Sequence, residues 1–308
     1  MHGPIGFQPY WLRKQGYAGK NLLQLIADEC FKKGITITAI TSQADEIIPR
    51  SVQDRLFCLR EYEAPLMPRD YNVDSVGQNI LRVEKDGQRV YLVNGQTVMP
   101  EEDGKRFDLL VVGSNQVPNS MNFRDTLKYC SDKGLTRIAE HPLVESHRGM
   151  GRQRLEKYIE QFDAVEGFNA QAIFPRALTR IPIVGSGFFS RAGRESNEEA
   201  KKVAREYEKP YVANSDAHRI KDLGISNIEW AGKVDDRSEE GFLADLKERV
   251  SSGRFKTVEK YMNVVGWCKW VTTFQRGLKQ KIEEAYIPSN ELRLCVKTNY
   301  YLYRIWIS

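Results

Sequence analysis

Helix-like and strand-like segments alternate along the chain from about residue 20, and this alternation limits the possible folds more than any other feature. Apolar residues of 21–33 recur at helical spacing, Gly34 follows as a C-terminal cap, and 35–40 has the composition of a strand. The same helix-to-strand order recurs at 121–140, 151–166 and 196–214. Repeats of this kind predict βα units in a mostly parallel sheet with covering helices.

Two segments depart from this alternation. Residues 80–93 alternate apolar and polar around the turn dipeptide Asp86-Gly87, which predicts a β-hairpin inserted at about 77–95. Aromatic residues at helical spacing follow residue 252 and lead to a tyrosine-rich, strand-like end. We therefore predict an α/β domain over 1–254 and a C-terminal helical and β extension over 255–308, whose aromatics either pack internally or form an oligomer contact.

Composition excludes several classes of protein. A chain of 308 residues that is 41% apolar can bury a large core, so disorder is not expected. Its net charge of +5 permits an anionic ligand without requiring one. The five cysteines form no CxxC pair, which favours reduced thiols and a cytoplasmic location. No apolar stretch approaches the length of a membrane span, so no membrane association is expected.

The sharpest local motif is Asn214-Ser215-Asp216-Ala217-His218, at the C-terminal end of a predicted strand. Ligands bind at that end in parallel α/β folds because the strand-to-helix loops converge there. Asp216 and His218 are two residues apart in an extended segment, so both can reach one cation, and this donor pair suits zinc, manganese or iron. A turn with a capping aspartate and a surface histidine explains the pair equally well.

Two further strand ends carry candidate ligands. His141 ends the predicted strand at 136–140, and Pro142 predicts an extended backbone for it. Glu166 ends the next predicted strand. A lone histidine is often a hydrogen-bonded structural residue, and this glutamate has three open roles: a metal ligand, a helix cap, or a partner that orients a neighbouring histidine.

Taken together, these motifs resemble the phosphoesterases of the polymerase and histidinol phosphatase (PHP) family. The resemblance to the second half of that family rests on three strand ends in the same order: His141-Pro142, then Val165-Glu166-Gly167 with Asn169, then Ser215-Asp216-Ala217-His218 with Leu223-Gly224. The resemblance to its first half rests on His2-Gly3-Pro4, the helix at 20–33, Gly34 and the strand that leads to Thr41. It covers about residues 1–252 and implies a PHP-like distorted (β/α)7 barrel.

The resemblance also shows where this chain departs from the family. Thr41-Ser42-Gln43 stands where the family has Thr-Asp-His, Ser114-Asn115-Gln116 stands near the place of a family glutamate, and only His2 can represent the opening histidine pair. The chain has four histidines, too few for the family's trinuclear cluster. The resemblance implies one or two divalent ions (zinc, manganese or iron), or none, with these candidate ligands: His2, His141, Asp216, His218 and Glu166, with Asp45 or Glu46 as substitutes.

Two glycine-flanked basic loops are candidates for phosphate binding. They contribute Arg148, Arg152, Arg191 and Arg194, each in a predicted connection between βα units. The arginine fork suits phosphate oxygens, although isolated basic residues in loops are usually only solvated. A small phosphorylated ligand or a nucleotide is therefore a candidate partner, and nucleic acid remains open.

Two hypotheses follow. In the first, the protein is a metal-dependent phosphoesterase with a reduced metal site, and a metal-activated water hydrolyses a phosphate ester. In the second, it is a catalytically inactive protein with a PHP fold that binds a phosphate-bearing ligand or a protein partner. The intact Asp-x-His and His-Pro strand ends favour the first, and the small number of histidines favours the second.

Overall fold

The computed structural model describes residues 20–43, 55–119, 121–144, 148–174 and 193–267. Within these ranges the main sheet has eight strands: β1 (Ile37–Gln43), β2 (Asn72–Ser75), β3 (Ile80–Lys85), β4 (Gln88–Val98), β7 (Leu109–Val112), β8 (Thr136–Ala139), β9 (Ala164–Asn169) and β10 (Tyr211–Asn214). Two small sheets pair β5 (Glu101–Glu102) with β6 (Lys105–Arg106) and β11 (Asn227–Glu229) with β12 (Lys256–Val258).

The described α-helices are α2 (Leu22–Lys33), α4 (Arg55–Cys58), α5 (Phe123–Asp132), α6 (Arg152–Tyr158), α7 (Arg194–Glu206) and α8 (Glu239–Ser252). Short turns of other helical types are η2 (Leu59–Glu63), η3 (Ala64–Leu66), η5 (Ile159–Gln161) and η7 (Ile220–Asp222). Where they fall on the described residues, the predicted helices and strands are confirmed within a few residues at their ends. In the part of the chain described here, every helix is too short or too polar to cross a bilayer.

Helix ends follow the cap chemistry that the sequence predicts. The Asn21 side chain accepts a hydrogen bond from the Gln24 amide at the start of α2, and Gly34 ends that helix with φ 66°. The Asn122 side chain caps α5 in the same way by accepting from the amide of Asp125. These caps fix where the chain leaves each helix and enters the following strand.

Strand β4 is the centre of the sheet, because it pairs with three other strands. One edge pairs in parallel with β1, and the other pairs antiparallel with β3 along its first half and with β7 along its second half. The predicted hairpin is formed by β3 and β4. Both strands belong to the main sheet, so the hairpin is not a separate insertion. Because β3 and β7 together occupy one edge of β4, β1 pairs with the opposite edge.

The direction of the strands differs from the prediction of a mostly parallel sheet. Four strand pairs are antiparallel (β2–β3, β3–β4, β4–β7 and β7–β8) and three are parallel (β1–β4, β8–β9 and β9–β10). The sheet is thus a mixed one, with the strand order β10-β9-β8-β7-β4-β3-β2 and β1 beside β4. Among the described strands no pairing closes this order into the predicted barrel.

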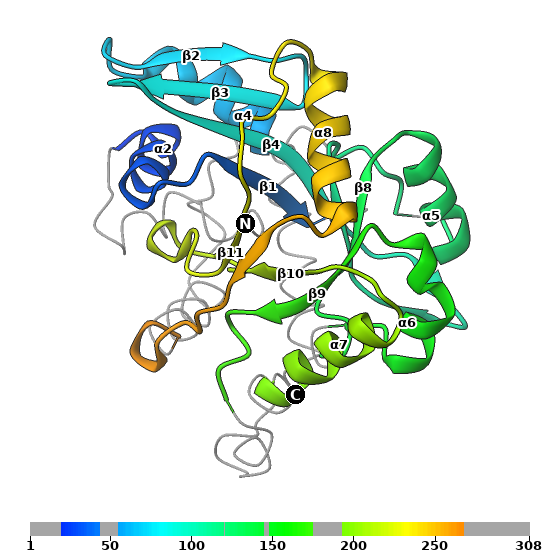
Figure 1. The fold of residues 1–308 in the computed structure, drawn as a ribbon. Coiled ribbons are helices and arrows are strands. Elements are labelled where there is room, and N and C mark those ends of the chain that lie inside the picture. The colour runs from blue at the N-terminus through cyan, green and yellow to red at the C-terminus, as the bar shows by residue number, and fades with distance from the viewer. Residues whose placement is uncertain (1–19, 44–54, 120, 145–147, 175–192, 268–308) are drawn as a thin grey trace, which may run out of the picture.

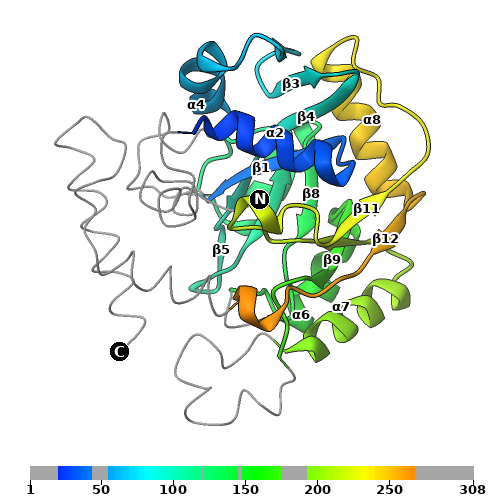
Figure 2. The same ribbon diagram turned by 90° about the vertical axis from the view of Figure 1, so that its left-hand side faces the viewer.

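Helices cover both faces of the sheet (Figure 1). Along β7, Leu109 and Val111 face the core formed with α5, α6 and α7, whereas Leu110 and Val112 face the core formed with α8. All four residues are buried, which explains why this strand is apolar throughout instead of alternating. Figure 2 shows α2 and α8 from the side, and α2 packs on β3 and β4 in a third core.

The predicted extension is described only as far as residue 267. Its first part forms β12, which pairs with β11, and Trp267 packs edge-to-face against Phe174 at a centroid distance of 5.0 Å. Trp270 and Phe274 lie outside the described residues, so an oligomer contact through 255–308 stays a prediction.

Gly95 lies where β4 changes its partner from β3 to β7, and it allows close contact with both neighbouring strands. A Cβ atom there would lie 2.9 Å from the Val111 carbonyl oxygen and 3.0 Å from Cγ2 of Thr41. We expect Gly95→Ala to lower the free energy of unfolding by about 1–3 kcal/mol through overpacking. Urea unfolding followed by circular dichroism measures this change.

The matched control is Gly87→Asn, in the turn of the same hairpin. Gly87 has φ 74°, a Cβ atom added there would meet no atom within 4 Å, and asparagine tolerates this backbone conformation. We expect this control to stay close to wild type. Equal stability of the Gly95→Ala variant and wild type would contradict the close approach of the three strands.

Candidate functional site

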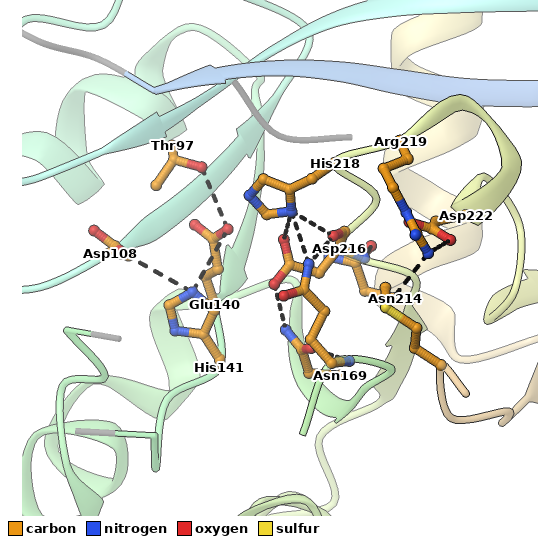
Figure 3. A network of polar contacts seen from close by, with 12 residues as sticks. Thr97, Asp108, Glu140, His141, Asn169, Asn214, Asp216, His218, Arg219 and Asp222 are labelled. Carbon is orange, nitrogen blue, oxygen red and sulfur yellow. Dashed lines mark hydrogen bonds and ion pairs between the residues drawn. The ribbon is translucent and has the colours of Figure 1, made fainter. Parts of the chain in front are cut away.

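Polar and ionisable side chains converge at one end of the main sheet (Figure 3). They come from the ends of β4, β8, β9 and β10 and from the residue that precedes β7. The strands that carry or precede them are anchored by buried apolar residues. The group consists of Thr97, Asp108, Glu140, His141, Glu166, Asn169, Gln171, Asp216 and His218, and we refer to it as the strand-end cluster.

One half of the cluster is built on the neighbouring strands β9 and β10. Asn169 pairs with Asn214 in the parallel register, which places Glu166 and Asp216 within reach of a single amide. The Asn169 Nδ2 group donates to Glu166 Oε1 and to Asp216 Oδ2, both at 3.2 Å. Asn169 therefore holds two carboxylates together. Its amide is neutral, so it does not compensate their negative charge.

The other half is built where β7 meets β8. His141 Nε2 lies 3.8 Å from Asp108 Oδ2 and 3.9 Å from Glu140 Oε1, and the side chains of all three residues are buried. Thr97 donates its hydroxyl to Glu140 Oε1 at 3.3 Å. Arg148 contacts the cluster at its margin, with Nε 3.2 Å from Asp108 Oδ1.

Glu166 joins the two halves. Its Oε2 accepts a hydrogen bond from the backbone amide of His141 at 2.5 Å. Because its Oε1 accepts from Asn169, this one carboxylate fixes the end of β8 relative to the β9–β10 pair. Among the roles left open by the sequence, that of an orienting partner agrees with this contact.

The backbone is strained at two of the candidate metal ligands, His141 and Asp216. His141 has φ 26° and Asp216 has φ 45°, a region that residues other than glycine seldom adopt. The extended backbone predicted for His141 from Pro142 is therefore wrong. The cause is the turn that follows, in which the Val144 amide donates to the His141 carbonyl at 2.9 Å. Strain of this kind is typical of functional sites.

Gly149 packs against that turn and helps to hold it. A Cβ atom at Gly149 would lie 2.7 Å from the His141 carbonyl oxygen and 2.8 Å from that of Pro142, so only glycine fits. The Gly149 amide donates to the Val144 carbonyl at 3.0 Å. In the loop predicted to bind phosphate, Gly149 is therefore required by close packing against the turn.

Negative charge dominates the electrostatics of the cluster. Burial alone would lower the pKa of His141, but Glu140, Glu166, Asp108 and Asp216 outweigh burial and raise this pKa above its ordinary value. Burial raises the pKa of Glu166 to about 7; His141 opposes this shift, and Glu140 and Asp216 add to it. A cation placed here would therefore be strongly attracted.

The structure brings four of the predicted residues together, namely His141, Glu166, Asp216 and His218. It places Arg152 on the exposed start of α6, where it pairs with Glu156 and Glu206, each at 2.7 Å. Arg194 donates from Nε to the Ile173 carbonyl at 2.9 Å and stacks on Tyr261. The remaining predicted residues, His2, Asp45, Glu46 and Arg191, lie outside the described residues.

The sequence interpretation did not select five members of the cluster as site residues: Thr97, Asp108, Glu140, Asn169 and Gln171. Glu140 directly precedes His141 at the end of a buried strand. This position could have identified it, because a carboxylate is seldom buried without a compensating partner. Asp108 stands at the start of its strand and would lie at the opposite end of a parallel sheet. Nothing in the local sequence marked Gln171.

The donors suit a divalent cation in kind, and in part in spacing. Two ligands of a tetrahedral zinc ion lie roughly 3.4 Å apart, and the distances from His141 Nε2 to Asp108 and Glu140 are close to this value. Within the described ranges, however, no three histidine, cysteine or carboxylate side chains converge closely enough to hold one ion. The described side chains thus include pairs with suitable spacing, but no group of three that could hold one ion.

Residues 194–251 match the family model described as PHP-associated. The chain carries a PHP-associated region. This region runs from α7 through β10 and the Asp216–His218 turn to α8, so it includes Asp216 and His218 of the strand-end cluster. The predicted resemblance to PHP proteins is confirmed over this part of the chain.

One solved structure supports the assignment of the fold. The crystal structure of PsfC from Pseudomonas syringae PB-5123 is similar to the chain with a TM-score of 0.50 and 12% sequence identity, over 84% of this chain and 89% of PsfC. At this identity the similarity concerns the fold alone. No curated protein matches the sequence significantly.

The raised pKa of Glu166 predicts how stability depends on pH. The folded protein holds the proton up to about pH 7, whereas the unfolded chain releases it near the ordinary glutamate value of 4.5. This contribution to stability is therefore complete below pH 4.5 and is lost as the pH rises toward 7, by on the order of 3 kcal/mol. Glutamine has no such proton, so the stability of wild type relative to Glu166→Gln should fall between about pH 4.5 and pH 7.

Urea unfolding at several pH values, with a chelator present, measures this difference. The matched control is Glu102→Gln. Burial would raise the pKa of Glu102, but hydrogen bonds from Lys157 and Tyr158 lower it, so its ionised form is the stabilising one. We expect no loss of stability with rising pH from that residue. A difference between wild type and Glu166→Gln that does not change with pH would contradict the prediction.

Proposed function

We propose that the protein is a PHP-like phosphoesterase, in which the strand-end cluster binds a divalent cation and hydrolyses a phosphate ester. The observation that carries the proposal is the proximity of four buried carboxylates to the buried imidazole of His141. Buried like charges are costly unless a cation compensates them. Together with the PHP-associated region, this arrangement favours a PHP-like site.

His141 together with Asp108 or Glu140 would supply the first donors to the cation, and Asp216 is the candidate for a further donor. Because no three of the described side chains of these types converge, the set of ligands is incomplete within the described ranges. When bound, such a cation supplies polarisation of the phosphate oxygens and of a water molecule. Zinc, manganese and iron all accept this combination of carboxylate and imidazole donors. His2, Asp45 and Glu46 lie outside the described residues, so the proposal does not depend on them.

The protein's own residues would position the reacting groups. Asn169 and Thr97 orient carboxylates by donating to them, and Glu166 holds His141 through its backbone amide. Arg148 is the described arginine of the predicted set that contacts the cluster, so it is our candidate for binding a phosphate oxygen. Asp108, which now contacts Arg148, would contact the cation instead.

A second candidate is a PHP-fold protein without catalytic activity that binds a phosphate-bearing ligand or a protein. The observation in its favour is that three metal-binding side chains do not converge within the described ranges. The two candidates differ in one measurable property, since only the first requires a divalent cation at stoichiometric level.

Metal content and hydrolysis of p-nitrophenyl phosphate test the proposal. We expect the purified protein to bind zinc or manganese, and we expect Asp216→Asn and His141→Gln to weaken that binding about tenfold or more, because each removes a donor. The matched control is Asp132→Asn, on the exposed surface of α5, where Asp132 pairs with Lys128. This control should keep the metal and the activity.

Wild-type protein that binds no divalent cation and releases no phosphate would contradict the proposal. If the same protein bound a phosphorylated ligand, the non-catalytic candidate would be supported instead.

A further inference from the structure

Asn197 is a buried asparagine within helix α7, on the face that packs against β9. Asparagine has a low helix propensity, and a buried amide is costly unless its polar groups are paired. One and two turns further along the helix, Ala200 and Ala204 continue this face and belong to the core that also contains Val165 of β9. An amide at such a position therefore requires polar partners on the strand.

The Asn197 side chain pairs with both backbone groups of Asn169. Its Oδ1 accepts from the Asn169 amide at 3.1 Å, and its Nδ2 donates to the Asn169 carbonyl oxygen at 3.1 Å. A flipped amide would lose both bonds, so its orientation is determined by its partners. Strand β8 pairs with β9 only as far as Val165, so Asn169 lies beyond the end of β8. Asn197 thus takes the place of a neighbouring strand at the end of β9.

The side chain of Asn169 also has only one orientation. Its Oδ1 accepts from the backbone amide of Gln171 at 2.8 Å, so its NH2 group lies on the opposite side of the amide. That group donates to Glu166 Oε1 and to Asp216 Oδ2, both at 3.2 Å. The bridge between the two carboxylates therefore depends on where the backbone of Asn169 is held.

Tyr261 supports Asn197 from the start of the predicted C-terminal extension. Asn197 Nδ2 also donates to the Tyr261 hydroxyl oxygen at 3.4 Å. The Tyr261 ring packs on Phe168 at a centroid distance of 4.6 Å, and the Met262 amide donates to the Ala170 carbonyl at 2.9 Å. The extension therefore contacts the residues on both sides of Asn169 in the chain.

We propose that Asn197 and Tyr261 are positioning residues, which hold the end of β9 so that Asn169 keeps the carboxylates of Glu166 and Asp216 together for a divalent cation. Both act through Asn169, and both side chains are neutral, so their effect on a cation comes from geometry and not from charge. Substitution of residues that orient metal ligands typically lowers metal affinity by about tenfold or more. The positioning of Asn169 follows from the contacts, whereas its effect on a cation rests on the proposed function.

Exchange of the Asn169 side-chain amide hydrogens with water measures the positioning without a metal. In metal-free protein labelled with 15N-asparagine, Asn169→Asp assigns these signals by removing them. We expect Asn197→Ala to accelerate their exchange about tenfold, because the backbone of Asn169 loses two hydrogen bonds. Tyr261→Phe removes only the hydroxyl and keeps the ring on Phe168, so it should accelerate the exchange by about two- to threefold.

The matched control is Asn72→Ala, on the exposed strand β2 at the opposite end of the strand order from β9 and β10. It removes the same amide from the surface, and it should leave the exchange at Asn169 unchanged.

Zinc affinity tests the consequence for the cation. Asn197→Ala should weaken zinc binding about tenfold in the otherwise wild-type protein. In the Asp216→Asn background the same substitution should change the affinity by less than about twofold, because the carboxylate that it positions is already absent. A role in overall stability alone would lower the affinity equally in both backgrounds.

Unchanged exchange at Asn169 in every folded variant would overturn the inference, as would equal losses of zinc affinity in the two backgrounds. Tyr261→Phe decides the first point if Asn197→Ala does not fold. If wild-type protein bound no zinc while the exchange at Asn169 responded to the substitutions, the proposed function would be contradicted and the positioning of Asn169 would still be supported.

Discussion

The antiparallel pairing of β7 with β8 is the constraint on which the candidate site depends. Its register places Leu109 opposite Ala139, so the residue before one strand lies beside the residues after the other. Asp108 is thereby brought next to Glu140 and His141, with His141 Nε2 3.8 Å from Asp108 Oδ2. If β7 ran parallel to β8, Asp108 would lie at the far end of the sheet and half of the cluster would be absent.

The parallel pairing of β9 with β10 provides the other half by a different route. Both strands end at the cluster, and Asn169 lies opposite Asn214. Each strand end then turns sharply, and the positive φ of Asp216 redirects its carboxylate toward Asn169. Buried apolar residues on both faces of the sheet fix these strands, so the strain at the turns is supported by the core and not by the site itself.

Sequence reasoning located the elements well, because helix and strand periodicity and cap residues such as Asn21 and Gly34 act locally. It did not give the direction of the strands, since pairing depends on residues far apart in the chain. For that reason Glu166, His141 and Asp216 were found as strand-end residues, whereas Asp108 was missed. The arginines show the same limit: Arg152 follows a predicted site loop but turns toward acids on α6 and α7.

An acidic cluster poses a problem for any phosphate ligand, because four carboxylates repel an anion unless positive charge or hydrogen-bond donors intervene. A cation would gain most beside His141, which lies among Asp108, Glu140 and Glu166. Arg148 contacts the margin of the same group, with Nε 3.2 Å from Asp108 Oδ1. An anionic ligand at this cluster therefore requires a cation beside His141, the guanidinium of Arg148, or both, to offset the repulsion from the carboxylates.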